Sequence, residues 1–523
     1  MIVMKNPLKK LFSGAMPEED NSKKTEAVIP TTFVGEEDIR SSLPVQTVSY
    51  FFCAKDELRL KYAQLFANEL KVPIGIVRKD LNRVLTNVRS DLSCCIEYPY
   101  VDEYYRDTYY NYYSRKHHDY NRYCFRISFF SGNVSETNYL SLKDEEITYY
   151  GYIVLRPTVR SVIGYTFFSP KIYEDNSFSI CLCERLTSVM GRRQVTSAFP
   201  FCGQDGEIIL CAETSIVTIF DYFSRRYNRY HRILPSEITA QLVDNLPYRV
   251  QPSRGLDAEM VTSILCALGL NIRRFECTEN DSEVDDYFVF KPEDFKRLLY
   301  IYIESGFPIY TVTSTHAFLV IGREDKLFSQ KPRLVTINDQ EYPYKLLDSQ
   351  EVDAIKSFLV PLPVNVLLDA NKIDPERIYN IFSRQCNGMQ ILSAEDTYYN
   401  RIFLTTSRSY KQYCVSSNIA ETSKRKIVSI AMPRFIWVCE SILTSELRDD
   451  LSQINVKSCM VLDATNYPEE STHLLLIKSQ HHIITPEEGN EGKTEKRWDI
   501  TSAEESMHPF NANLKGNHTQ WKG

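Results

Sequence analysis

The stretch 203-GQDGEIILCAETSIVTIFDYF-223 joins a turn signal, a cysteine and an apolar pattern, and it decides the fold of the middle of the chain. After Cys211, apolar side chains recur at intervals of three, four, seven and eleven residues, at Ile216, Ile219, Phe220, Phe223 and Tyr227. This period predicts an α-helix with one buried stripe. The Asp-Gly pair at 205–206 predicts a tight turn ahead of it. Cys211 is therefore expected in the first turn of the helix.

A cysteine in that position is a candidate nucleophile. The unsatisfied N–H groups and the positive end of the helix dipole favour a thiolate there. The amide N–H of Cys211 would point toward the oxygen of an attacked carbonyl, as one donor of an oxyanion hole. Gln204, seven residues earlier, is a candidate for the second donor through its side-chain amide.

A thiolate also needs a group that takes and returns a proton. His316 opens the strand-like segment THAFLVIGRE, and the next strand-like segment is RLVTIND, residues 333–339. If the two pair as an antiparallel hairpin centred between 327 and 328, His316 faces Asp339, with Cβ atoms about 4.5–5.5 Å apart. Asp339 would then hold the tautomer and orientation of the imidazole. Asn338 is the fallback orienter, because a long loop does not fix the register.

Length and pattern predict several domains. The chain has 523 residues, of which 43% are hydrophobic, enough for about three domains. Changes in composition and period predict a flexible tail at 1–45 and an accessory α/β domain at 46–195. A catalytic domain at 196–350, a second accessory α/β domain at 351–485 and a disordered tail at 486–523 are predicted to follow. The predicted fold class is α+β.

The net charge and the spacing of the cysteines limit the classes of partner and cofactor that the sequence predicts. The net charge of −7 gives no reason to expect a nucleic acid, and no run of about 18 apolar residues predicts a membrane span. The N-terminus lacks the apolar run of a signal peptide. Fourteen irregularly spaced cysteines indicate neither a zinc site nor a disulfide framework. We therefore expect a cytoplasmic protein with free thiols and with no metal or other cofactor.

The quoted residues resemble the papain-like cysteine peptidase superfamily. PFCGQDGEIILCAETSI looks like its active-site segment, SGFPIYTVTSTHAFLVIG is similar to the histidine strand of the bacteriocin-leader (double-glycine) peptidase branch, and TINDQEYPY resembles the Asp strand that follows. The resemblance covers about residues 196–350. It implies a papain-like α+β core, in which a helix carrying Cys packs on an antiparallel sheet carrying His and Asp, flanked by two further domains. The interval between the glutamine and the cysteine is one residue longer than in papain-type enzymes.

The resemblance also implies roles for the candidate residues. Cys211 would be the nucleophile, His316 the general base and acid, Asp339 the orienter and Gln204 the oxyanion donor. We expect an intracellular cysteine protease that cleaves a peptide or isopeptide bond in a protein substrate. The flanking domains would recognise that substrate, or would bind a regulatory protein or ligand. Bacterial stress or anti-phage defence is a candidate setting, although no residue indicates it.

Two other functions stay open at the level of sequence. A transglutaminase-like or acyltransferase-like enzyme uses Cys, His and Asp in the same order, with an amine as acceptor. Transglutaminases usually carry a tryptophan near the site, whereas the three tryptophans here, Trp437, Trp498 and Trp521, all follow the triad. The other possibility is an inert papain-like scaffold or binding protein, against which the intact Cys, His and Asp argue.

Overall fold

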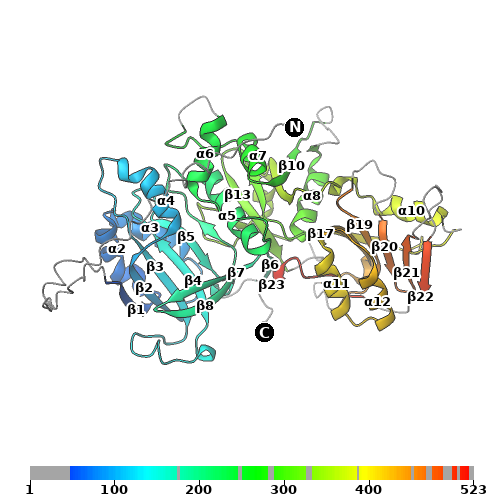
Figure 1. The fold of residues 1–523 in the computed structure, drawn as a ribbon, viewed down its shortest axis with the longest axis horizontal. Helices are drawn as coiled ribbons and strands as arrows, with labels where there is room; N and C mark the ends of the chain where they lie inside the picture. Colours follow the sequence, from blue (N-terminus) through cyan, green and yellow to red (C-terminus); the bar gives the residue numbers. More distant parts are fainter. Residues whose placement is uncertain are drawn as a thin grey trace, which may run out of the picture. The chain divides into compact units, whose positions relative to one another are not determined.

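The computed structural model describes residues 47–173, 177–245, 250–280, 288–325, 332–385, 388–448, 453–466, 474–486, 498–502 and 507–516. All named helices and strands lie in one compact unit, Val48–Gly523. The tail predicted at 1–45 lies outside the described residues. Three main sheets and a two-stranded hairpin, together with the helices around them, confirm the α+β class (Figure 1).

The first sheet is antiparallel throughout, in the order β1-β2-β3-β4-β5-β9. Its strands are β1 (Ser49–Ala54), β2 (Leu92–Tyr100), β3 (Cys124–Ser131), β4 (Tyr149–Leu155), β5 (Ile163–Phe168) and β9 (Phe201–Cys202). Helices α2 (Ala63–Leu70), α3 (Ile74–Val84) and α4 (Glu103–Asn111) accompany it, and β7 (Cys183–Val189) and β8 (Arg192–Ala198) form the hairpin.

The central sheet has the order β11-β10-β16-β12-β13-β14-β15, and β6 joins it by pairing with β13 and β23. Its strands are β6 (Phe178–Ile180), β10 (Leu270–Cys277), β11 (Val289–Phe290), β12 (Ile309–Val312), β13 (Ala317–Glu324), β14 (Leu334–Ile337), β15 (Lys345–Leu346), β16 (Ser357–Pro363) and β23 (Lys515–Gly516). The accompanying helices are α5 (Cys211–Arg226), α6 (Pro235–Asn245), α7 (Ala258–Ala267), α8 (Pro292–Glu304) and α9 (Ser349–Asp353). Strands β6, β16 and β23 come from outside 196–350, so this sheet is wider than the predicted catalytic domain.

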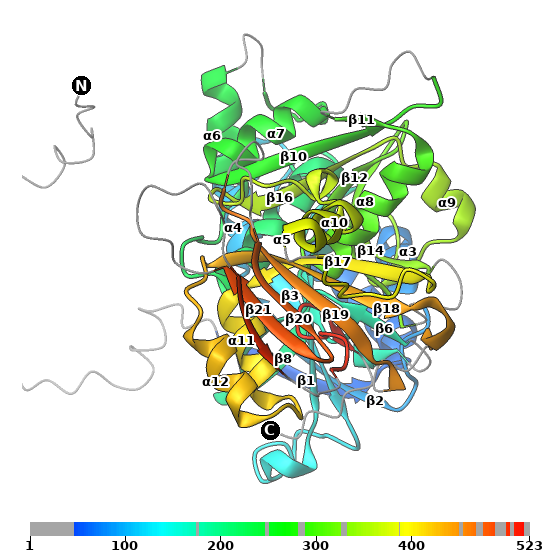
Figure 2. The ribbon, with the colours of Figure 1, turned by 90° about the vertical axis from the view of Figure 1, so that its right-hand side faces the viewer.

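The third sheet is a simple antiparallel series, β17 to β22 in order (Figure 2). Its strands are β17 (Tyr398–Thr406), β18 (Phe435–Leu443), β19 (Val456–Asp463), β20 (Leu474–Ser479), β21 (His482–Pro486) and β22 (Trp498–Ser502), with helices α10 (Pro375–Gln385), α11 (Ser407–Ser416) and α12 (Glu421–Ser429). Alternation buries both faces of β17: Phe403 joins a core with α11 and α12, whereas Ile402 and Leu404 join the main core.

The prediction of a disordered segment over 486–523 is wrong for part of it. Strand β22 pairs with β21, and β23 pairs with β6. Between them Phe510 is fully buried, and its amide N–H donates to Glu440 at 2.7 Å. The polar, aperiodic composition hid this order, because a few buried anchors hold the segment rather than a regular apolar pattern.

Helix α5 packs on β13 of the central sheet. Every residue from Ala212 to Phe223 is buried, so the prediction of a single buried stripe is wrong. The hydroxyl groups on the other face donate hydrogen bonds to carbonyl groups of the helix itself. Ser215, for example, donates to the carbonyl of Cys211 at 2.8 Å. This satisfaction allows polar side chains to face the interior.

Candidate active site

Cys211 is the first residue of α5, as predicted, and it is partly accessible to solvent. Ahead of it, Asp205 organises the approach loop: its Oδ1 accepts from the amides of Glu207, Ile208 and Ile209 at 2.8, 2.8 and 2.9 Å. Gly206 has φ +76°, a left-handed conformation that favours glycine at this turn. The cysteine therefore follows a rigid turn on a buried helix.

A buried carboxyl group supports the start of the helix. Glu213 Oε2 accepts from the amide of Leu210 at 3.2 Å, and its Oε1 accepts from the hydroxyl of Ser253 at 2.5 Å. Burial raises the pKa of Glu213, and the hydrogen bond from Ser253 partly opposes that rise. This contact ties the segment before α7 to the turn that presents Cys211.

His316 lies immediately before β13, and its side chain is 15% exposed. The thiol of Cys211 lies near enough to the imidazole to contribute to raising its pKa. Its Nε2 donates to Asn338 Oδ1 at 2.8 Å and lies 3.5 Å from Asp339 Oδ1. Gln340 Nε2 lies 3.4 Å from His316 Nδ1. Nε2 faces both orienting groups, so Nδ1, which also lies near the side-chain amide of Gln340, is the nitrogen that would accept a proton from the thiol.

The predicted register is wrong by one residue. Leu319 pairs with Ile337, and a bulge between Val320 and Gly322 shifts the pairing further. After Ile337 the chain leaves the strand for a turn, in which the carbonyl of Asn338 accepts from the amide of Glu341 at 3.1 Å. Strand alternation ends at that turn. Both the predicted orienter and its fallback therefore reach the imidazole, and Asn338 makes the shorter contact.

Opposing effects set the protonation of the histidine and the aspartate. Burial lowers the pKa of His316, but hydrogen bonds with Cys211 and Asn338 and the charge of Asp339 outweigh burial, so the pKa is raised. Burial raises the pKa of Asp339, and the nearby His316 and Arg83 oppose this rise without cancelling it. Asp339 is 4% exposed, and within the described chain its Oδ2 has no hydrogen-bond partner.

Gln204 is half-buried on the approach loop, and its side chain makes no hydrogen bond to any residue that the structure describes. Its side-chain amide therefore has no described hydrogen-bond partner, and its role as an oxyanion donor stays a prediction. Four supporting residues were not predicted from the sequence: Glu213, Ser253, Gln340 and Arg83. Of these, only Glu213 could have been predicted from local sequence, since an acidic residue at the third position of a helix commonly caps its start.

Comparison of the chain with models of protein families and with curated proteins finds no match. Among the described residues, no group of three or more His, Cys, Asp or Glu side chains is arranged to hold a metal ion. A search of the same residues for a helix long and apolar enough to cross a membrane finds none.

Proposed function

We propose that the chain is a papain-like thiol hydrolase that cleaves a peptide or isopeptide bond in a protein substrate. The observation that carries this proposal is Cys211 at the start of a buried helix, together with a His316 whose pKa the Cys211 thiol helps to raise. Asn338 and Asp339, both near Nε2 of the ring, add the orienting groups that such a mechanism needs.

The geometry supports an acyl-enzyme mechanism. The sulfur of Cys211 attacks the substrate carbonyl while Nδ1 of His316 takes the thiol proton. The amide of Cys211 and the side chain of Gln204 stabilise the oxyanion. The C–N bond breaks, and the imidazolium gives its proton to the leaving amine. Water then attacks the thioester with His316 as base, which releases the carboxylic acid and restores the thiol.

Thiol accessibility gives this proposal a sharp test. Ten of the thirteen described cysteines are buried; Cys211 and Cys277 are partly accessible and Cys266 is exposed. Cys266 is thus an internal reference for an ordinary accessible thiol. All described cysteines are free, which supports a reducing compartment such as the cytosol.

The experiment is iodoacetamide labelling at neutral pH, with each labelled cysteine quantified by mass spectrometry. We expect Cys211 to react at least about tenfold faster than Cys266, since activated cysteines have a larger thiolate fraction. His316→Ala should abolish this difference, and Cys211→Ala should remove the fast site. Equal rates at Cys211 and Cys266 in the wild-type chain would contradict an activated nucleophile. Cleavage of a peptide library by the wild type, but not by Cys211→Ala, then tests hydrolysis itself.

A further inference from the structure

A cavity of about 420 Å³ lies at the end of α5 opposite to Cys211. Arg226 and Tyr227 from the C-terminal end of that helix line it, as do the end of β17 and the start of α11. The helical rise places Arg226 about 22 Å from Cys211 along the axis. The cavity is therefore separate from the candidate active site.

Positive charge dominates the cavity wall. Arg226, Arg408 and Arg434 line it, and no lining residue in the described chain is acidic. None of the three arginines forms an ion pair with any described carboxylate. Arg226 instead donates to the hydroxyl of Tyr222 at 2.6 Å and to the carbonyl of Asn513 at 3.4 Å. Arg226 is partly buried with no described carboxylate to balance its charge, and the exposed Arg408 and Arg434 add two further positive charges, so this wall suits an anion from outside the chain.

Two of the three arginines are held by contacts within the chain, Arg226 by the hydrogen bonds above and Arg434 by two aromatic rings. The guanidinium of Arg434 lies over the rings of Tyr227 and Phe435, at 5.9 and 5.5 Å from their centroids. The carbonyl of Arg434 accepts from the amide of Ser407, the first residue of α11, at 3.0 Å. This bond fixes Arg434 beside the helix start, where the dipole also favours negative charge.

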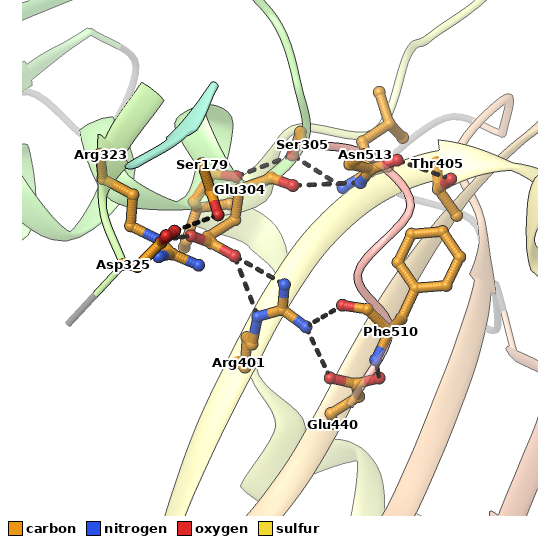
Figure 3. Close-up of polar contacts among 12 residues, drawn as sticks. Ser179, Glu304, Ser305, Arg323, Asp325, Arg401, Thr405, Glu440, Phe510 and Asn513 are labelled. Carbon is orange, nitrogen blue, oxygen red and sulfur yellow. Dashed lines mark hydrogen bonds and ion pairs between the residues drawn. The ribbon is translucent and has the colours of Figure 1, made fainter. Parts of the chain in front are cut away.

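Neutral polar groups complete the wall, and a buried network holds them. Ser305, Thr405 and Asn513 line the cavity. Figure 3 shows these three residues together: Thr405 donates to Asn513 Oδ1 at 2.9 Å, and Asn513 Nδ2 donates to the carbonyl of Glu304 at 3.1 Å. The hydroxyl of Ser305 accepts from the amide of Leu404 at 2.8 Å. Segments from three parts of the chain thus form one preorganised wall.

We propose that this cavity binds a phosphorylated small molecule of mononucleotide size, with the phosphate among Arg226, Arg408 and Arg434. Guanidinium groups match phosphate oxygens in geometry and charge. The volume exceeds what an inorganic phosphate ion fills and lies in the range of small-ligand pockets. Tyr227 and Phe307 offer apolar surface for the organic part.

The test is isothermal titration calorimetry on the full chain, with the four ribonucleoside 5′-monophosphates, the four nucleosides and inorganic phosphate as probes. We expect a nucleoside monophosphate to bind, inorganic phosphate to compete more weakly and the nucleosides not to bind. Arg408 and Arg434 are exposed, so Arg408→Gln/Arg434→Gln should fold normally. It should weaken binding by about tenfold or more, because hydrogen bonds to charged groups are lost.

Two control variants make the outcome unambiguous. Arg425→Gln removes an exposed arginine of α12 outside the cavity and should leave the affinity unchanged. Cys211→Ala should also bind with unchanged affinity, so this test stands apart from the proposed hydrolase. The proposal is overturned if no nucleoside monophosphate binds at millimolar concentration, even where phosphate alone does. Equal affinity for the nucleosides, or an undiminished affinity in the double variant, overturns it as well.

Discussion

The guanidinium of Arg83, in helix α3, donates a hydrogen bond to the backbone carbonyl of Asp339, the carboxylate beside His316. Arg83 also pairs with Asp80 at 3.4 Å, and Asp80 Oδ2 in turn accepts from the amide of Val162 at 2.8 Å. A helix beside the first sheet thereby supports the turn that carries the orienting groups. Arg83 is a positioning residue for the candidate active site.

Loss of this support should slow the chemistry at Cys211. We expect Arg83→Gln to lower the rate of iodoacetamide alkylation of Cys211 by about tenfold, because a hydrogen bond from a charged donor is lost and the turn at Asp339 relaxes. The rate at Cys266 in the same sample should not change. Arg78→Gln, an exposed arginine on the same helix, is the matched control. Equal Cys211 rates in the two variants would show that Arg83 has no positioning role.

The raised pKa of His316 predicts the pH range of the imidazolium. A raised pKa keeps the ring protonated to higher pH than the ordinary value of about 6.5. Protonation of the leaving amine is then lost as the pH rises through the raised value. Asn338→Ala removes one of the hydrogen bonds that raise this pKa, so both the His316 titration and the alkaline fall in activity should move to lower pH.

NMR titration of the imidazole protons of His316 measures this shift directly. Asn82→Ala, at an exposed asparagine of α3, is the control and should leave the titration unchanged. A titration of His316 that stays in place, or moves to higher pH, in Asn338→Ala would contradict the contact at Nε2 as a cause of the raised pKa.

The order of the candidate residues was readable from the sequence, because it depends on local patterns. The helix start at Cys211 follows from the apolar period and the Asp-Gly turn, and the strands near His316 and Asp339 follow from alternation. Local pattern does not fix a hairpin register across a long loop, so the pairing of Leu319 with Ile337 was missed. Only the turn after Ile337 brings both Asn338 and Asp339 to the ring.

The residues that support the candidate site could not be predicted from the sequence, because they contact residues that are far away along the chain. Arg83 and Asp339 are 256 residues apart, and an arginine among other polar residues on α3 carries no signal of its partner. The same holds for Phe510 and Asn513, whose long-range hydrogen bonds anchor a segment with a composition typical of disorder. Pattern reveals which face of an element is apolar, whereas such long-range polar pairs depend on the tertiary fold.

Asp339 should lower the stability of the fold at neutral pH. Burial raises its pKa in the folded chain, so the folded state binds this proton more tightly than the unfolded state. Stability then falls as the pH rises from the unfolded toward the folded pKa, and the cost is complete above the folded value. We expect Asp339→Asn to melt at a higher temperature than the wild type at pH 7, with slower alkylation of Cys211.

Thermal unfolding followed by circular dichroism at pH 7 and at pH 3 separates charge from packing. At pH 3, below the ordinary aspartate pKa of about 3.9, the carboxyl is neutral in both states and the two melting temperatures should converge. A lower melting temperature of Asp339→Asn at pH 7 would mean that the ionised carboxylate stabilises the fold, contrary to this prediction.

Glu304, at the end of α8, lies between Arg323 of β13 and Arg401 of β17 (Figure 3). Arg401 Nη2 lies 2.6 Å from Glu304 Oε2, and its Nη1 lies 2.9 Å from Glu440. Burial raises the pKa of Glu304, but the two arginines outweigh burial and bring it to about 2. Among the residues that the structure describes, Glu440 pairs with one arginine, and burial keeps its pKa raised. Glu304 therefore joins the central and third sheets as a buried carboxylate.

Glu304→Gln should lower the free energy of unfolding by about 3–5 kcal/mol, because it leaves two buried arginines short of a counter-charge. For a lowered pKa, the stabilisation is present above the ordinary value of about 4.3 and is lost as the pH falls toward about 2. The free energy of unfolding of the wild type, measured with urea, should therefore fall over that pH interval, and that of Glu304→Gln should fall less. Glu293→Gln, at an exposed glutamate of the same helix, should behave like the wild type. Parallel pH dependence in the wild type and Glu304→Gln would show that the carboxylate of Glu304 does not hold the two sheets together.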